Sequence, residues 1–161
     1  MTDLVTPSNI TFCDGDLFAS GAAALVNPVN CVGVMGAGLA KQFKQRFPAM
    51  FADYQVQCAA RFYQPGDCRI WRRPEQPLIV NIATKDHWRE PSQIAWVDRG
   101  LRSLAAMLEP NGIRSIAVPP LGCGLGGLPW SEIRNLITEH LSGSETEVLV
   151  YGSAPANHAG A

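Results

Sequence analysis

The sequence that decides the fold is Val-Asn-Pro-Val-Asn-Cys-Val-Gly-Val-Met-Gly-Ala-Gly-Leu-Ala-Lys, residues 26–41. An apolar run over 22–26 predicts a strand before it, and apolar residues at helical spacing over 37–47 predict a helix after it. The glycines between them let the backbone approach a ligand, because glycine has no Cβ. A helix start behind such a loop offers free N–H groups to an anion. The stretch matches neither G-x-G-x-x-G nor a Walker loop. It predicts a site for a phosphate-containing ligand, with an ordinary strand-to-helix turn as the alternative.

Length and composition indicate one globular domain. The chain has 161 residues, 47% hydrophobic and 17% charged, which is enough to build a core. The net charge of −1 argues against a protein covered in positive charge for unspecific nucleic-acid binding. No apolar run approaches the roughly 18 residues of a membrane span, and no signal region begins the chain. Five cysteines without C-x-x-C spacing indicate reduced thiols. We therefore expect a cytoplasmic protein that makes no membrane contact.

Apolar patterns along the chain predict strands that alternate with amphipathic helices. The expected strands cover 10–13, 22–26, 68–72, 78–84, 115–118 and 147–151. The expected helices cover 37–47, 50–58, 92–108 with Ser92 as its cap, and 130–141. This order predicts an α/β sheet covered by helices on both faces. We expect one domain over 10–151, a disordered segment over 1–9 and a flexible tail over 152–161.

A second glycine loop, Pro-Pro-Leu-Gly-Cys-Gly-Leu-Gly-Gly over 119–127, follows the expected strand at 115–118. Its four glycines exceed what an economical turn needs, because each glycine has an entropic cost. In open α/β sheets, ligands bind beyond the carboxyl ends of the strands. We therefore expect the two glycine loops to hold a diphosphate between them, against the alternative of two structural turns.

Lys85 follows the most apolar strand and is one of three lysines. At the mouth of a pocket a lysine loses hydration, which makes it a nucleophile or a base. A solvated surface lysine is the alternative. His87 is either a general base or a residue of the rim. No His, Cys or Asp cluster has metal-ligand spacing and no G-x-S-x-G frame is present, so we expect neither a metal nor another cofactor.

Other side chains have two interpretations each. Asp16 reads an exocyclic amine or caps a helical turn that starts after it. Tyr151 stacks on a base or fills the sheet edge. Cys31 and Cys123 lie inside the glycine loops, where they line a site or pack in the core. A last set pairs basic with flat side chains, as single-stranded nucleic-acid surfaces do, although solvated charge also explains it. This set is Arg69, Trp71, Arg72, Arg73, Trp88 and Arg89.

Three ordered motifs resemble those of the macrodomain family, whose members bind ADP-ribose. They are Gly15-Asp16-Leu17, Asn27-Pro-Val-Asn30 followed by Gly-Ala-Gly-Leu-Ala over 36–40, and Gly-Cys-Gly-Leu-Gly over 122–126. The resemblance covers nearly the whole chain, over 10–151. It implies a three-layer α/β/α fold around a mixed sheet of about six strands.

The resemblance also implies roles for single residues. Lys85 stands where relatives use a catalytic lysine, and Asn27 or Asn30 is implied to orient the hydroxyls of the distal ribose. The further residues implied to bind ADP-ribose are Asp16, Leu17, Cys31, Gly36, Ala37, Gly38, Leu39, Thr84, His87, Leu121, Gly122, Cys123, Gly124, Leu125, Gly126 and Tyr151.

Within the family the sequence is similar to two branches. DarG-type antitoxins remove ADP-ribose from thymidine in single-stranded DNA, and the branch of the human terminal ADP-ribose protein glycohydrolase releases it from acidic side chains. The second branch has an aspartate where this chain has Gly126. The resemblance therefore implies a glycohydrolase of thymidine-linked ADP-ribose. The alternatives are hydrolysis of glutamate- or aspartate-linked ADP-ribose, deacetylation of O-acetyl-ADP-ribose, and binding without turnover. An ADP-ribosyltransferase toxin is an implied partner, and we expect a monomer.

Overall fold

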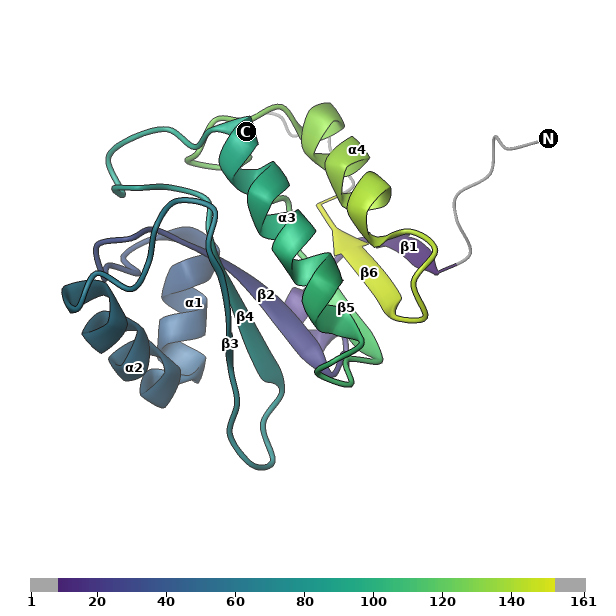
Figure 1. The fold of residues 1–161 in the computed structure, drawn as a ribbon, viewed down its shortest axis with the longest axis horizontal. Helices are drawn as coiled ribbons and strands as arrows, with labels where there is room; N and C mark the ends of the chain where they lie inside the picture. Colours follow the sequence, from purple (N-terminus) through teal and green to yellow (C-terminus); the bar gives the residue numbers. More distant parts are fainter. Residues whose placement is uncertain (1–8, 153–161) are drawn as a thin grey trace.

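The computed structural model of the chain describes residues 9–152. Six strands and four helices follow one another in these residues (Figure 1). The strands are β1 (Ile10–Cys13), β2 (Ala24–Val29), β3 (Cys68–Trp71), β4 (Leu78–Ala83), β5 (Ser115–Val118) and β6 (Glu147–Tyr151). The helices are α1 (Gly38–Arg46), α2 (Pro48–Ala59), α3 (Ile94–Leu108) and α4 (Trp130–Leu141), and a 3-10 turn, η1 (Leu17–Ala19), follows β1.

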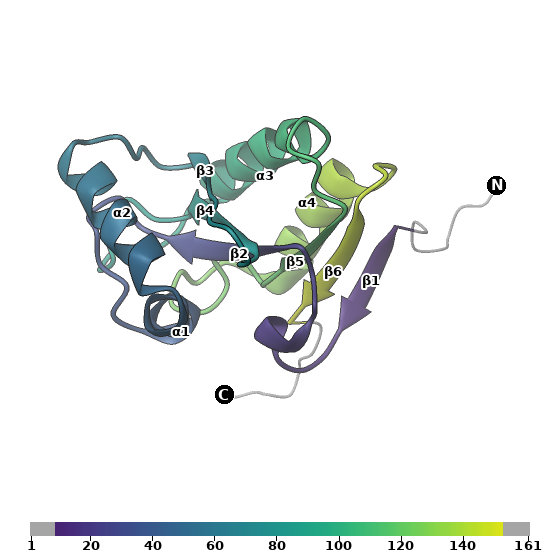
Figure 2. The same ribbon diagram turned by 90° about the horizontal axis from the view of Figure 1, so that it is seen from below.

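The strands form one sheet in the order β1-β6-β5-β2-β4-β3. Neighbouring strands are parallel except β3, which runs antiparallel to β4 at one edge, so the sheet is mixed. Helices α1 and α2 cover one face of the sheet, and α3 and α4 cover the other (Figure 2). The expected three-layer α/β/α architecture is confirmed.

Burial explains why these strands and helices could be predicted from the sequence. Five of the six residues of β4 are buried, because helices cover the sheet on both sides, and the strand is therefore apolar except for Asn81. Helix α3 buries Val97, Leu101, Leu104 and Leu108 at spacings of three and four residues. The two faces of the sheet carry separate apolar clusters, one under α3 and α4 and one under α1 and α2.

The second strand differs from its expected bounds. It begins at Ala24 and continues through Pro28 to Val29, whereas the apolar run suggested 22–26. In a parallel strand, the backbone N–H and C=O groups of successive residues point alternately to the two neighbouring strands. The carbonyl of Val29 accepts from Thr84 N, which follows β4, so the backbone of Pro28 points toward β5. The pairing between β2 and β5 has already stopped at Leu25 and Ala117. The missing N–H of proline therefore breaks no hydrogen bond there.

Ser92 does not cap α3, contrary to expectation. The helix begins at Ile94, with Gln93 as an N-cap that makes no side-chain hydrogen bond. Ser92 is buried instead beside the second glycine loop, where its N–H donates to Gly126 O at 3.0 Å. The contact between distant loops outweighs the local capping preference.

The segments expected to be disordered, 1–9 and 152–161, lie outside the described residues except for Asn9 and Gly152. Asn9 belongs to the domain, because its side-chain amide donates to Leu141 O at 2.9 Å and to Thr146 O at 3.1 Å. None of the helices within 9–152 is long and apolar enough to cross a membrane.

Candidate functional site

The two glycine loops meet where the chain changes direction across the sheet. Strands β2 and β5 are neighbours, but β2 leads to α1 on one face and β5 leads to α4 on the other. Their ladder ends at Leu25 and Ala117, before either strand ends. Ligands of open α/β sheets bind at such a switch point, outside the carboxyl ends of the strands. The expected placement of both glycine loops at one edge is confirmed.

The first loop is organised by Asn30. Its Oδ1 accepts from Val32 N at 3.0 Å, and its Nδ2 donates to Val34 O at 2.8 Å. The buried hydroxyl of Tyr54 lies 2.9 Å from Oδ1 and 2.8 Å from the carbonyl oxygen of Asn30. Asn30 thus holds the loop that leads to α1, and only 7% of it is exposed.

Both glycine loops present backbone donors. The N–H groups of Gly36, Ala37 and Gly38 at the start of α1 donate to no acceptor among residues 9–152. Those of Gly124 and Leu125 in the second loop likewise lack an acceptor within that range. Successive free N–H groups form an anion-binding concavity, and the start of α1 adds its positive dipole end. The arrangement can hold two phosphates.

Asn27 lies too deep to touch a ligand, which corrects its expected contact with ribose. It is fully buried, and its Nδ2 donates to Asn81 Oδ1 at 3.0 Å. Asn81 in turn donates to the hydroxyl of Tyr63 at 3.3 Å. Asn27 therefore belongs to a polar chain inside the domain that links β2 to β4.

Lys85 lies beside the first glycine loop because backbone hydrogen bonds join the two loops. Thr84 N donates to Val29 O at 3.0 Å, and Cys31 N donates to Asp86 O at 3.1 Å. Thr84 itself is buried, whereas Lys85 is half-buried and its Nζ donates to Trp88 O at 3.1 Å. The amine is thereby held at the carboxyl end of β4, next to the loop that follows β2.

Burial keeps the cysteines of the site protonated. It raises the pKa of the Cys31 thiol to about 12, and the nearby Asp86 carboxylate adds to the rise. It raises the pKa of Cys123 to about 11. A thiol needs its thiolate form to act as a nucleophile. Neither side chain is therefore suited to nucleophilic attack at neutral pH, which leaves Lys85 as the candidate nucleophile of this edge.

A flat platform follows Lys85. His87 and Trp88 have ring centroids 5.4 Å apart, and the guanidinium of Arg89 lies 4.7 Å from the Trp88 ring centre. His87 Nδ1 accepts from Arg89 N at 3.1 Å, so that nitrogen serves the turn itself. Trp88 is 45% exposed beside the amine of Lys85. Trp88, three residues after Lys85, belongs to the basic and aromatic set expected from the sequence.

The second loop is closed by its own backbone. Leu128 N donates to Gly122 O at 2.9 Å, and Cys123 N donates to Pro120 O at 3.1 Å. Leu121 is fully buried and supports the loop from inside, whereas Leu125 is 78% exposed. The loop thus presents backbone and one apolar side chain.

Gly126 lacks space for any side chain. A Cβ at this position would overlap Ser92 Oγ and the carbonyl of Gly122. The Oγ of Ser92 is buried and has no hydrogen-bond partner within 9–152. The glycine is therefore required by packing.

Asp16 and Tyr151 meet at the other end of this edge. Strands β1 and β6 pair Cys13 with Tyr151. Burial raises the pKa of Tyr151, and the nearby Cys13 and Asp16 add to the rise. Asp16 Oδ1 accepts from Phe18 N at 3.0 Å and caps η1, so the capping interpretation is confirmed, while Leu17 is buried in the core. Asp16 is exposed and its charge lies near Tyr151, at the end of β6.

The sequence matches a known family. The family model described as Macro domain matches residues 26–137. The chain belongs to the Macro domain family. It is 44% identical over 146 residues to a Thermus aquaticus protein named DNA ADP-ribosyl glycohydrolase, covering 88% of this chain and 41% of that protein. The chain thus spans about two fifths of the length of that curated relative.

Solved macrodomains superpose on the whole described domain. The macrodomain of Mycobacterium tuberculosis DarG has a TM-score of 0.87 and 38% identity, covering 90% of this chain and 98% of that one. Thermosipho africanus DarTG in complex with ADP-ribose has a TM-score of 0.87 and 34% identity, covering 91% of this chain and 42% of that one. The curated Thermosipho protein is named as a fusion of a DNA ADP-ribosyl transferase and a DNA ADP-ribosyl glycohydrolase.

Proposed function

We propose that this macrodomain binds ADP-ribose across the switch point and hydrolyses it from thymidine in single-stranded DNA. The observation that carries the proposal is the placement of Lys85 beside two loops of free backbone N–H groups. The loops suit a diphosphate. The distal ribose, which is attached to the diphosphate, would then lie next to the amine of Lys85. The names of the DarG relatives support the same activity.

The strand order gives the ligand a direction. Adenine lies at the ends of β1 and β6, near Asp16 and Tyr151. The diphosphate lies between the loops after β5 and β2, and the distal ribose lies at the ends of β2 and β4, near Asn30 and Lys85. Adjacent strands are about 4.8 Å apart, so these five strands span the length of an extended dinucleotide-like ligand.

The reaction cleaves the bond between C1 of the distal ribose and the thymine nitrogen. Water supplies the hydroxyl of the new anomeric carbon, and its remaining proton goes to the base. Lys85 assists by one of two routes. Its amine forms an imine with C1 that water then hydrolyses, or it positions the departing base. Borohydride reduction during turnover distinguishes the routes, because only an imine leaves ADP-ribose bound to Lys85, which mass spectrometry detects.

The packing of Gly126 favours DNA over protein as the acceptor. The protein-directed branch carries an aspartate at this position, and here Ser92 and Gly122 occupy the space that a side chain needs. An acyl-linked substrate would therefore have to be hydrolysed without that carboxylate. We also propose a monomer, and a DNA ADP-ribosyltransferase as the partner whose product this domain removes.

The test is release of ADP-ribose from two substrates by wild type and Lys85→Ala. One is a thymidine-modified single-stranded oligonucleotide, and the other is a glutamate-modified protein. Turnover of the oligonucleotide that is lost in the variant is the expected result. Turnover of the protein alone would move the substrate to the second branch. Binding of ADP-ribose with no turnover of either substrate would leave a non-catalytic reader.

A further inference from the structure

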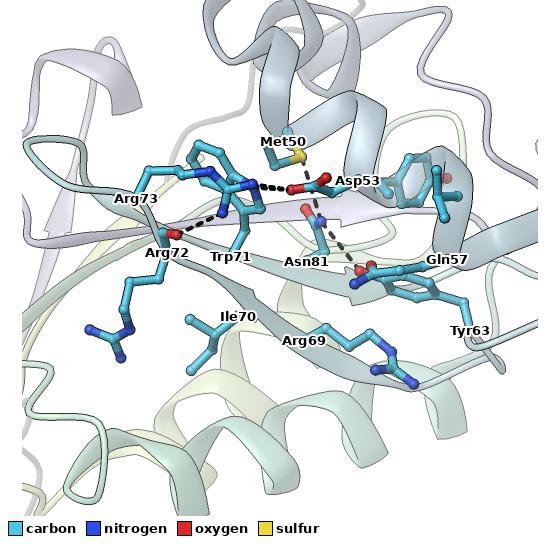
Figure 3. A pocket seen from close by; sticks show the side chains of 12 residues that line it. Met50, Asp53, Gln57, Tyr63, Arg69, Ile70, Trp71, Arg72, Arg73 and Asn81 are labelled. Atoms are coloured by element: carbon cyan, nitrogen blue, oxygen red, sulfur yellow. Dashed lines mark hydrogen bonds and ion pairs between the residues drawn. The ribbon is translucent and has the colours of Figure 1, made fainter. Parts of the chain in front are cut away.

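A groove lies beside helix α2 and the edge strand β3, and one end of it reaches Cys31 and Val32 of the first glycine loop. One part has a volume of about 520 Å³ and includes Cys31 and Asp86, the residue after Lys85. The other part, about 360 Å³, lies between α2 and β3 (Figure 3). Tyr63 lines both parts, and residues 56–59 of α2 run from one into the other. We call the two parts together the α2–β3 groove.

The lining of the groove is positively charged. Arg61, Arg69 and Arg73 line it against two aspartates, whereas the guanidinium of Arg72 points away from α2 and donates to Asn111, beyond the end of α3 (Figure 3). Asp53, one of these aspartates, is already paired with Arg73 at 2.6 Å between Oδ2 and Nη2. The chain as a whole has a net charge of −1, so the excess of arginine is local. Such a groove attracts a polyanion.

The arginines retain capacity to bind anions. Arg69 donates through Nη2 to Phe62 O at 2.6 Å, which leaves its Nη1 without an acceptor within 9–152. Arg61 is exposed, and its guanidinium also has no acceptor among these residues. A phosphate would give each guanidinium a charged acceptor, and charge-assisted hydrogen bonds are about twice as strong as neutral ones.

Some exposed apolar side chains lie in the groove or beside its arginines. The large apolar side chains exposed within 9–152 are Val32, Val34, Val56, Phe62, Trp88 and Leu125. Val32 and Val56 line the groove, while Phe62 is 55% exposed and lies 5.6 Å from the Arg69 guanidinium. The others stand on the glycine loops and beside Lys85. A flat exposed ring with an arginine above it is a platform on which a nucleobase stacks.

We propose that the α2–β3 groove binds the single-stranded DNA that flanks the modified nucleotide. Phosphates pair with the arginines and a base stacks on Phe62. The groove begins beside Lys85, so a strand that lies in it delivers one nucleotide to the amine. An acidic peptide would use the charge but not the aromatic platform. The identity of the modified nucleotide rests on the proposed function, whereas binding of unmodified DNA to the groove does not.

The first test measures binding of a labelled, unmodified oligodeoxythymidine of about 16 nucleotides by fluorescence anisotropy. The groove variant is Arg61→Glu with Arg73→Glu, both at exposed positions of the lining. The control is Arg114→Glu with Arg134→Glu, which changes the net charge equally but lies before β5 and on α4. We expect Kd to rise about tenfold or more in the groove variant, and the salt slope to fall by about 1.4 for two lost phosphate contacts. The control should bind nearly as wild type does.

A third variant, Phe62→Ala, separates stacking from charge. It should weaken binding about fivefold to a hundredfold with the salt slope unchanged, because it removes no charge. Melting curves of all variants confirm that each is folded. Equal binding by the groove variant and the control would overturn the inference. The inference would also be overturned if the groove bound a polyglutamate peptide more tightly than the oligonucleotide.

Turnover distinguishes the groove from the proposed function. The groove variant should hydrolyse ADP-ribosylated thymidine nucleoside as fast as wild type does, but lose kcat/KM on the modified oligonucleotide. If wild type hydrolyses neither substrate, the proposed function fails while the anisotropy still decides the groove. Equal kcat/KM of wild type and groove variant on the oligonucleotide would contradict the groove.

Discussion

Replacing Gly126 with alanine tests the geometry of the second glycine loop. A Cβ there would overlap Ser92 Oγ and Gly122 O. One of these neighbours is backbone and the other is a buried side chain, so neither moves easily, and overpacking of this kind costs about 1–3 kcal/mol. We expect Gly126→Ala to lower the free energy of unfolding by about this amount. Where the loop shifts instead, the same energy weakens ADP-ribose binding about fivefold to 150-fold.

Urea unfolding and calorimetric titration with ADP-ribose measure the two effects. Gly124→Ala is the matched control in the same loop, because no heavy atom lies within 4 Å of its Cβ. Its unfolding free energy should stay within about 0.5 kcal/mol of wild type. Adding Ser92→Gly to Gly126→Ala should restore part of the loss, since the Gly122 carbonyl still blocks the Cβ. The reasoning is refuted if Gly126→Ala unfolds and binds as wild type does, or if Gly124→Ala is equally destabilised.

Three further changes test other contacts. Tyr54→Phe removes the hydroxyl that donates to Asn30, so we expect a loss of about 1–3 kcal/mol in unfolding free energy and weaker ADP-ribose binding; an unchanged urea curve would contradict this. The hydrogen bond from His140 holds the pKa of Asp98 below its ordinary value, and the stability that this contributes is present above the unfolded pKa and lost as the pH falls. Wild type should therefore lose stability below about pH 4 more steeply than His140→Gln, and equal acid profiles would count against the pair. Burial raises the pKa of Cys31 to about 12, so iodoacetamide should leave this thiol largely unmodified at about pH 8. Mass spectrometry detects the labelled protein, and rapid labelling of Cys31 would refute its burial.

The sequence specified the architecture well because its patterns are local. The helical spacing in α3 and the mostly apolar sequence of β4 follow directly from burial. The bounds of β2 were misjudged because Pro28 usually ends a strand. Its tolerance depends on the neighbour β5 having stopped pairing, and β5 lies almost ninety residues further along the chain. No local pattern contains that fact.

In the candidate site, too, some features could be predicted from the sequence and others could not. The glycine loops were predicted from residue type and position, whereas the catalytic role of Lys85 was implied only by the family resemblance and stays a prediction. Asn27 and Asn30 look equivalent there, yet one is fully buried against Asn81 while the other organises a surface loop. The partner of Asn30, Tyr54, reads as one more apolar position of α2. Arginines of the α2–β3 groove were already part of the basic and aromatic set expected from the sequence. That the groove reaches Asp86, next to Lys85, could be seen only in the fold.

The early end of the ladder between β2 and β5 has a mechanical consequence. One phosphate loop is anchored in the apolar cluster under α1 and α2, and the other in the cluster under α3 and α4. Near the switch point, few backbone hydrogen bonds tie the two halves of the domain together. A diphosphate bound between the two loops would link them where β2 and β5 no longer pair. Ligand should therefore slow amide hydrogen exchange in α1 and in α4 together, although the two helices lie on opposite faces.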